Sequence, residues 1–446
     1  MNETRQRPGA GEKTCYFLAN VGNIPVMGLL SAFFMIFYTD VVGLNPAAIA
    51  TLFLISKTMD GISDPIMGFV LDKFPVTKMG KFRPMLILGT VICVINYILL
   101  WFGAVWIPVG KYVIVYVTYL LLGWTFDIMD ISLNSLLPVM TAENNERNKL
   151  SLIKSFGYMV GAAVLGIAGP MIISSGTLQS YYVLIFGSMA VTLVFSIAGA
   201  LGIKERVSFE GKAEEKYSLK EMLGFLRMKP IWVMFLTALL ATVGSTIANG
   251  TSSYFFTYIM GDIKLMSGVS VVSLICTVIS MLISPILANR AGKKKILLLG
   301  LCIAIAGTAI RLLNPRSLAL IFAGTAIGGL GGGLTSPLVY GIQADNTMYV
   351  QFKTGKRVEA AIASLTSFIT KVGQGVAGAI PGYVLAACGY VGTAQTQPES
   401  VSKGIIFCVL ILPLIITAAA GLLFGTQYTL DKEEIDRIGQ EIAGQG

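Results

Sequence analysis

Two aspartates lie four residues apart in the middle of an apolar stretch. The string KTMDGISDP places Asp60 and Asp64 within residues 51–71, with Lys57 one helical turn earlier. Side chains four residues apart share one face of a helix, with Cβ atoms about 6 Å apart, so the two carboxylates could share one small cation or one proton. Because a charge at the centre of a membrane span costs about 2.5–3.5 kcal/mol, such residues usually face a polar cavity and act there. We interpret the pair as a candidate ion site.

A second acidic pair, Asp127 and Asp130, lies three residues apart in FDIMDISLNS. Four acids on two helices offer hard oxygen ligands, which suit an alkali cation better than a soft metal. The chain has no histidine, so imidazole metal sites are excluded and any proton relay must use carboxylates. We expect all four acids to hold the cation. Carboxylates serve Na⁺, Li⁺ and H⁺ alike, so the sequence leaves the ion open, and no other cofactor is expected.

Two lysines accompany these acids: Lys57, and Lys371 in the apolar string FITKVGQG. If all six groups are ionised inside the membrane, two negative charges remain, which a bound cation or bound protons would balance. The alternative is a set of static salt bridges that only hold helices together. For Lys57 and Asp60 taken alone, that alternative is the favoured one.

The composition identifies the elements that must position these groups. Of 446 residues, 54% are hydrophobic and 13% charged, and the mean hydropathy is +0.74. The apolar sequence comes in blocks of about 20 residues, the length of a helix that crosses about 30 Å of hydrocarbon. We therefore expect an all-α integral membrane protein. The net charge of +9 comes from basic residues in loops, which argues against a nucleic-acid partner. The six cysteines are dispersed and indicate neither a disulfide framework nor a metal site.

Apolar blocks predict about twelve spans. They begin near residues 15, 46, 84, 111, 150, 180, 230, 267, 296, 317, 359 and 404. With both termini in the cytoplasm, about 25 of the 33 Lys and Arg residues fall on the cytoplasmic side and about five outside, as the positive-inside rule requires. We expect a multi-pass protein of the cell membrane.

The longest polar stretch divides the chain almost in half. It predicts an N-terminal six-helix bundle over residues 1–203, a cytoplasmic linker over 204–229, and a C-terminal bundle with a cytoplasmic tail over 230–446. Within the linker, Ser218 and Glu221 have the spacing of a capping box and predict a short interfacial helix to Arg227. Twelve helices in two halves are typical of the major facilitator superfamily, in which the substrate lies near the midplane between the halves.

Basic turns follow the second and eighth spans, in DKFPVTKMGKFRP and NRAGKKK. They either orient the protein by charge or form a gate, in which Asp72 pairs with Lys81 or Arg83 across neighbouring helices. A separate string, GTAIGGLGGGLTSP, looks too rich in glycine for a stiff helix. Close helix packing is its favoured explanation, and bending is the alternative. No GK[ST] follows it, which argues against a phosphate-binding loop.

Four strings carry a family resemblance: YTDVVGL, LFLISKTMDGISDPIMG, GKFRP and ADNTMYVQFKTGKRVEA. In order and spacing they resemble the glycoside-pentoside-hexuronide:cation symporters, the group of the melibiose carrier. The resemblance implies that Asp60 and Asp64 bind the cation, that Asp130 serves cation and sugar, and that the last string is a cytoplasmic loop. It places Lys57 and Lys371 in the same central cavity. The gating candidates are Asp72, Gly80, Lys81, Arg83, Lys356 and Arg357.

The chain departs from this family where the sugar would bind. At the sugar site the departures are Ile24 beside Asn23 in place of an acid, Asn134 in place of an aromatic, and Ser155 beside Lys154 in place of an arginine. Elsewhere, Asp127 replaces a hydroxyl residue near the cation, and Gln351 replaces a glutamate of the loop motif. A neutral galactoside is therefore disfavoured, and Lys371 and Lys154 favour an anionic substrate such as a hexuronide by charge complementarity. The candidate substrate-binding residues are Asp130, Lys371, Asn23, Asn134, Lys154 and Lys57.

Together these observations predict a secondary active transporter, not an enzyme, that imports a sugar or glycoside with a cation by alternating access. Its partners would be a small solute and membrane lipids, and a monomer would suffice. One alternative is a family member that carries a non-sugar solute or exports its solute. A less favoured alternative is a membrane sensor that binds its ligand without transport.

Overall fold

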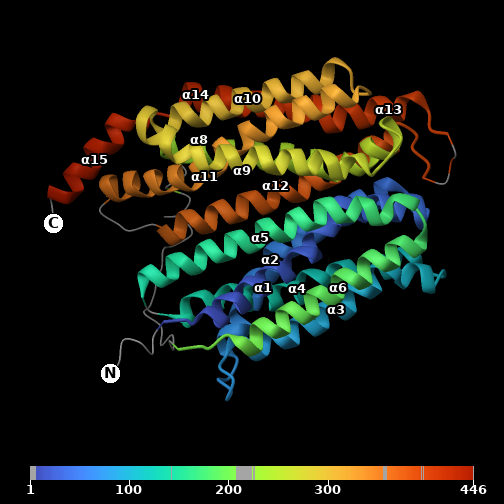
Figure 1. The fold of residues 1–446 in the computed structure, drawn as a ribbon, viewed down its shortest axis with the longest axis horizontal. Coiled ribbons are helices and arrows are strands. Elements are labelled where there is room, and N and C mark those ends of the chain that lie inside the picture. Colours follow the sequence, from blue (N-terminus) through green and yellow to red (C-terminus); the bar gives the residue numbers. More distant parts are fainter. Residues whose placement is uncertain are drawn as a thin grey trace. The chain divides into compact units, whose positions relative to one another are not determined.

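The computed structural model describes residues 7–141, 143–206, 224, 227–354, 359–392, 394 and 396–444 (Figure 1). Inside helices it leaves the side chains of residues 58, 61–65, 68–72, 144, 359–361, 363–365, 367–368, 439 and 442–444 undescribed. The side chains of Asp64 and Asp72 are therefore outside the described part, as are Lys356 and Arg357 altogether. The predicted interfacial helix of the linker also falls outside it, apart from Gly224 and Arg227.

The described residues form helices, and their β structure is a single bridge between Thr77 and Gly80. The chain divides into two compact units. Unit 1 comprises Met1–Glu214 with Tyr390–Thr396, and unit 2 comprises Glu215–Gly389 with Gln397–Gly446. The helices of unit 1 are α1 (Ala10–Leu29), α2 (Pro46–Lys73), α3 (Phe82–Trp106), α4 (Lys111–Met140), α5 (Asn144–Ile172) and α6 (Leu178–Gly202).

Unit 2 contains the remaining helices. They are α8 (Lys229–Tyr254), α9 (Leu265–Ala291), α10 (Lys293–Leu313), α11 (Leu318–Thr354), α12 (Glu359–Ala387), α13 (Glu399–Ile406), α14 (Leu412–Gln427) and α15 (Lys432–Gly444). A π-turn joins α13 to α14, so residues 399–427 make one spanning segment.

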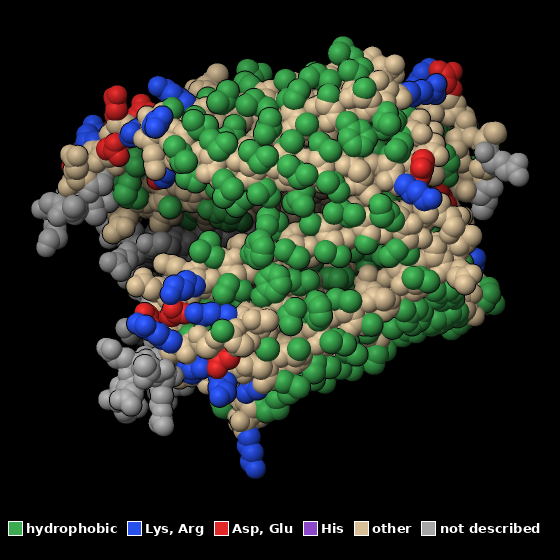
Figure 2. Space-filling view, in the orientation of Figure 1, with side chains coloured by type: hydrophobic (Ala, Val, Ile, Leu, Met, Phe, Trp, Pro, Cys, Tyr) green, Lys and Arg blue, Asp and Glu red, His purple; other side chains and the backbone are tan. Residues whose placement is uncertain are grey.

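Ten helical segments of the described residues are long and apolar enough to cross a membrane. Helices α2 and α12, at 28 and 29 residues, also have the necessary length. On the face seen in Figure 2, hydrophobic side chains cover the middle of the helices, and charged side chains gather toward their ends. The all-helical membrane fold predicted from hydropathy is confirmed.

The first helix of each unit ends in the same way. After α1 and a first π-turn at Leu30–Phe34, the helical segment closes with a five-residue π-turn, Phe37–Val41, and α8 is followed by one at Phe255–Ile259. Each leads to a glycine, Gly43 or Gly261, with φ of 77°, a conformation that favours glycine because it has no Cβ. The two strings, FYTDVVG and FFTYIMG, therefore mark an internal repeat that the sequence pattern had not revealed.

Aromatic side chains pack the end of unit 1 where α1 terminates. Phe34 and Phe37 contact the ring of Trp101 at centroid distances of 5.7 and 5.1 Å, and Phe37 lies 4.8 Å from Tyr181. All four are buried. Each aromatic pair at these distances stabilises the fold by about 0.5–1.5 kcal/mol in addition to the contribution of buried apolar area. These contacts therefore stabilise the position of the C-terminal end of α1.

The glycine-rich string of the tenth span stays helical throughout α11. A Cβ on Gly331 would lie 2.5 Å from the carbonyl oxygen of Gly300 in α10, and one on Gly324 would lie 2.4 Å from that of Gly307. Side chains at these positions would force the two backbones apart. Close packing, the favoured interpretation of this string, is confirmed.

One prediction about α11 was wrong. The string that begins at Ala344 was expected to be a cytoplasmic loop, but the helix continues to Thr354, for a total of 37 residues. Its polar residues are held by packing inside unit 2, where Asn346 is fully buried and accepts a hydrogen bond from the Tyr428 hydroxyl at 3.1 Å. These polar residues extend the helix because other segments supply their partners: Lys293 of α10 for Asp345, and Tyr428 at the end of α14 for Asn346.

Candidate functional site

The carboxylate of Asp130 is the centre of a polar cluster inside unit 1. Asn23 Nδ2 donates a hydrogen bond to Asp130 Oδ1 at 2.8 Å, and Asn134 Nδ2 donates to Oδ2 at 2.9 Å. Asn134 follows Asp130 by one turn of α4, and Asn23 comes from α1, which packs against α4. Both carboxylate oxygens are therefore fixed in direction by amides, and each keeps acceptor capacity for a further ligand.

Lys154 on α5 extends this cluster. Its Nζ donates a hydrogen bond to Asn134 Oδ1 and lies 5.6 Å from the ring centroid of Tyr158, one turn along the same helix. The structure thus brings together Asn23, Asp130, Asn134 and Lys154, four predicted site residues from three helices.

Tyr158 was missed in the sequence because an aromatic residue in a mostly apolar helix gives no distinctive pattern. Its one available signal is the spacing of four residues from Lys154, which places both side chains on one face of α5. An ammonium within about 6 Å of an aromatic face is attracted to the ring. The ring therefore supplies an apolar surface beside the polar cluster, on a helix where the family resemblance did not suggest one.

Asp60 forms a second charged site, on α2. Lys57 Nζ lies 2.7 Å from Asp60 Oδ2, and the two side chains are 26% and 15% exposed. This is the pair for which a static salt bridge was favoured, and the structure contains that bridge. Asp60 also faces α4, because a Cβ on Gly123 would lie 2.6 Å from Asp60 Oδ1. Gly123 therefore leaves the space that the carboxylate occupies.

The remaining acids are placed by their helices. Asp127 is on α4, one turn before Asp130, and Asp64 is on α2, one turn after Asp60. Among the described side chains, no three acids or cysteines gather closely enough to hold a metal ion. The four-acid cage needs the Asp64 side chain, which is outside the described part, so the cage stays a prediction. Lys371 belongs to α12 in unit 2, and its place in a shared cavity stays a prediction as well.

The gating candidates Lys81 and Arg83 bind a different acid, Glu205. Their expected pairing with Asp72 stays a prediction, because the Asp72 side chain is outside the described part. The carboxylate of Glu205, just after α6, accepts hydrogen bonds from the backbone amides of Lys81 at 2.8 Å and of Phe82 and Arg83 at 2.9 Å. These are unsatisfied amides at the start of α3, where the helix dipole also favours an anion. The string GKFRP therefore forms a carboxylate-capped helix start inside unit 1.

Arg83 completes the same contact from its side chain. Its guanidinium donates hydrogen bonds to the carbonyl oxygens of Ala200 and Leu201 at the end of α6, and to that of Met79 at 3.0 Å. Arg206, which follows Glu205 in the sequence, donates two 2.7 Å hydrogen bonds to the carboxylate of Glu12 in α1. The start of α1, the start of α3 and the end of α6 are thus tied to one another within unit 1.

Unit 2 has its own charged contact at the basic turn NRAGKKK. Lys293 Nζ lies 2.6 Å from Asp345 Oδ1 of α11 and donates to the carbonyl oxygen of Gly341 at 3.3 Å. The turn before it contains Gly292 with φ of 88°, as the first basic turn contains Gly80 with φ of 102°. In both basic turns, therefore, a glycine with positive φ directly precedes a lysine that binds an acid: Lys81 binds Glu205 through its backbone amide, and Lys293 binds Asp345 through its side chain.

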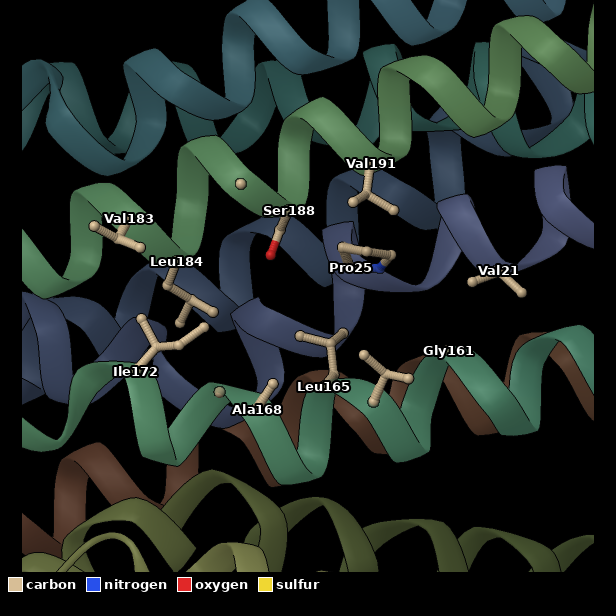
Figure 3. A pocket seen from close by; sticks show the side chains of 13 residues that line it. Val21, Pro25, Gly161, Leu165, Ala168, Ile172, Val183, Leu184, Ser188 and Val191 are labelled. Atoms are coloured by element: carbon tan, nitrogen blue, oxygen red, sulfur yellow. The ribbon is translucent and has the colours of Figure 1, made fainter.

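An apolar pocket of about 170 Å³ lies between α1, α5 and α6 (Figure 3). Its walls include Pro25, Leu165, Leu184 and Val191, and Ser188 supplies the polar side chain that Figure 3 shows. None of the predicted site residues lines it. Because sugars and cations need polar partners, this pocket is not the candidate site.

The fold and the cluster define a class of protein. Ionisable residues inside a bundle of spanning helices mark solute and ion pathways, and two units of spanning helices with an internal repeat are the architecture of secondary transporters. Residues 15–432 match the family model described as MFS/sugar transport protein. The chain belongs to this family, the glycoside-pentoside-hexuronide group of the major facilitator superfamily, and the resemblance found in the sequence is confirmed.

Known relatives agree with this assignment. The chain is 29% identical to the isoprimeverose transporter of Lactiplantibacillus pentosus over 88% of this chain and 83% of that protein. It is also 29% identical to the glucuronide carrier protein homolog of Escherichia coli (strain K12), over 89% and 88%. Among solved structures, a bacterial homologue of the human lysosomal transporter Spinster has a TM-score of 0.68 at 14% identity, covering 96% and 97%. That last likeness shows the fold alone.

Proposed function

We propose that this transporter couples the inward movement of Na⁺, Li⁺ or H⁺ to that of an anionic glycoside, with a hexuronide as the model substrate. The observation that carries the proposal is the hydrogen-bonded chain from Asp130 through Asn134 to Lys154. It holds a carboxylate and an ammonium one amide apart, inside a helix bundle. The first can ligate a cation and the second can bind an anion, so one site serves both solutes.

The charges of unit 1 support the cation half of the proposal. Helices α2 and α4 carry the four aspartates of the predicted cation site, and Lys57 already neutralises Asp60. With Lys154 as the second lysine, two negative charges remain if all groups are ionised. Desolvated charge of this size is costly, and one bound alkali ion or proton at Asp64, Asp127 and Asp130 would reduce it.

Lys154 and Tyr158 support the substrate half. The two relatives of equal identity carry a neutral and an acidic sugar by name, so the names leave the charge of the substrate open. An ammonium beside an aromatic ring fits a sugar acid: the ammonium pairs with the carboxylate, and the ring covers the apolar face of the sugar. A neutral glycoside would leave the Lys154 charge without an anionic partner, which is costly in a desolvated site.

The proposal also places the protein in the cell membrane with both termini in the cytoplasm, because that orientation puts most basic residues on the cytoplasmic side. Transport is the proposed activity, with no enzymatic step, no nucleic-acid partner and a monomer as the working unit. Lys371 of unit 2 is proposed as a further contact to the anionic substrate.

A thermal-shift screen of the purified protein tests this proposal. Methyl β-D-glucuronide and methyl β-D-glucoside differ only at C6, where one has a carboxylate and the other a hydroxymethyl group. We expect the glucuronide to raise the melting temperature, and more so with Na⁺, Li⁺ or low pH, because ligands of the native state stabilise it by mass action. Equal shifts with both glycosides would refute the anionic substrate. Asp64→Cys should remove the cation effect.

A further inference from the structure

Asn134 lies between two opposite charges, and its amide can take only one orientation there. The carboxylate of Asp130 can only accept hydrogen bonds and the ammonium of Lys154 can only donate them. The amide must therefore turn its Nδ2 toward Asp130 and its Oδ1 toward Lys154, as the structure has it. Both hydrogen bonds are charge-assisted, which makes them stronger than bonds between neutral groups.

We infer that Asn134 is the positioning residue that couples cation binding at Asp130 to anion binding at Lys154. This inference rests on the proposed function and adds the physical link between its two halves. Asn134 acts through its neighbours: it holds Lys154 at a distance of one amide from Asp130, and it transmits the charge of each group to the other.

The link works through electrostatics. Without a substrate, the positive charge of Lys154 polarises the Asn134 amide and opposes a cation at Asp130. A substrate carboxylate that pairs with Lys154 neutralises this charge, and Asn134 then donates a weaker hydrogen bond to Asp130 Oδ2. That oxygen becomes a better ligand for the cation. Because coupling is reciprocal, the cation raises the affinity for the substrate by the same factor.

A matched control is available in the same unit. Asn96 is a buried asparagine, and its Nδ2 donates a hydrogen bond to the carbonyl oxygen of Thr118 at 2.9 Å. That bond joins α3 to α4 through a neutral partner. Replacing Asn96 by leucine removes a helix-to-helix hydrogen bond as Asn134→Leu does, but it leaves the two charges untouched. Comparison of the two variants therefore distinguishes a role of Asn134 in coupling from a purely structural role.

The experiment measures the Kd of methyl β-D-glucuronide by titration of the purified protein, with and without the cation that most stabilises the wild type among Na⁺, Li⁺ and H⁺. We expect the cation to tighten binding about tenfold or more in the wild type, within the usual range of coupling. Asn134→Leu should reduce this factor to less than about twofold, and Asn96→Leu should retain it. If Asn134→Leu does not fold, Asn134→Asp gives the same loss, because the added carboxylate binds Lys154 directly.

A second arm uses no glycoside. Lys154→Met removes the charge that opposes the cation, so the variant should bind the cation about tenfold more tightly than the wild type. An unchanged cation affinity would overturn the inference, as would full coupling in Asn134→Leu. A wild type that binds glucuronide and glucoside equally would instead contradict the proposed function, and with it this inference. That outcome is seen before any residue is replaced.

Discussion

The carboxylate of Glu205 occupies the space in which a side chain at Gly80 would lie. A Cβ on Gly80 would be 2.4 Å from the Glu205 carboxyl carbon and 2.6 Å from both of its oxygens, and Gly80 has φ of 102°. The glycine of GKFRP is thus required twice, for its backbone conformation and for the acid that caps α3. Two stretches 125 residues apart in sequence depend on one small residue.

We expect Gly80→Ala to lower the thermal stability of the purified protein by more than Gly110→Ala. Gly110 also has a positive φ, 81°, but a Cβ there meets no atom within 4 Å. Backbone strain of about 1 kcal/mol acts on both variants, whereas Gly80→Ala also displaces the cap, which is worth about 1–2 kcal/mol. Combining Gly80→Ala with Glu205→Ala should cost less than the sum of the two single changes. Additive losses would show that Glu205 does not cap α3.

Two adjacent glycines of α11 give a second test. A Cβ on Gly331 would meet backbone atoms of Gly300 and Ala304 at 2.5–2.6 Å, but one on Gly332 meets nothing. We expect Gly331→Ala to destabilise the protein by about 1–3 kcal/mol through overpacking. Gly332→Ala should be neutral or stabilising by up to about 1 kcal/mol, because alanine favours helix. Melting temperatures of both variants measure the difference, and equal values would contradict the close contact of α10 and α11.

The ion pair between Lys57 and Asp60 predicts a cation-dependent stability. Lys57→Met leaves the partly buried carboxylate without its 2.7 Å partner, so the variant should melt at a lower temperature than the wild type. A cation can replace the missing charge, and we therefore expect added Na⁺ or Li⁺ to raise the melting temperature of Lys57→Met more than that of the wild type. If the cation raises the melting temperature of both proteins equally, Asp60 is not part of the cation site.

Tyr158 should contribute to substrate affinity through its ring. Tyr158→Phe keeps the ring and should bind methyl β-D-glucuronide within about twofold of the wild type, whereas Tyr158→Leu should bind about tenfold more weakly, which corresponds to about 1.4 kcal/mol. Cation binding without glycoside should be the same in both variants. A loss in Tyr158→Phe as large as that in Tyr158→Leu would show that the hydroxyl, and not the ring, carries the effect.

The spans and the acids could be predicted from the sequence because each depends on local composition. The length of an apolar block predicts a membrane span regardless of its packing partners. An aspartate inside such a block stands out because placing a charge in the membrane costs free energy. The contacts of Glu205 and Tyr158 could not be predicted in this way. Glu205 finds its partners more than 120 residues away. Tyr158 is one of 17 tyrosines, and although its spacing puts it on the same face of α5 as Lys154, only the packing of α1, α4 and α5 shows that this face meets Asp130.

In the polar part of α11, local composition predicts the wrong structure. Its composition resembles a loop, yet it remains helical because Asn346 and Asp345 find partners in Tyr428 and Lys293. Tertiary hydrogen bonds here override a local preference. The hydrogen-bonded cluster of Asp130, Asn134 and Lys154 could be predicted in part. Its residues could be chosen from the sequence, but only the structure shows that the Asn134 amide joins the two charges.

The most direct measurement of the central claim is uptake of radiolabelled methyl β-D-glucuronide into proteoliposomes, with and without an inward gradient of Na⁺, Li⁺ or H⁺. Accumulation above the external concentration with one of these gradients, and none with methyl β-D-glucoside, is the result that a cation-coupled carrier of anionic glycosides requires. Lys154→Met should lose this accumulation while still binding the cation. Glucuronide that only equilibrates under every gradient, or glucoside that accumulates equally, would contradict the account.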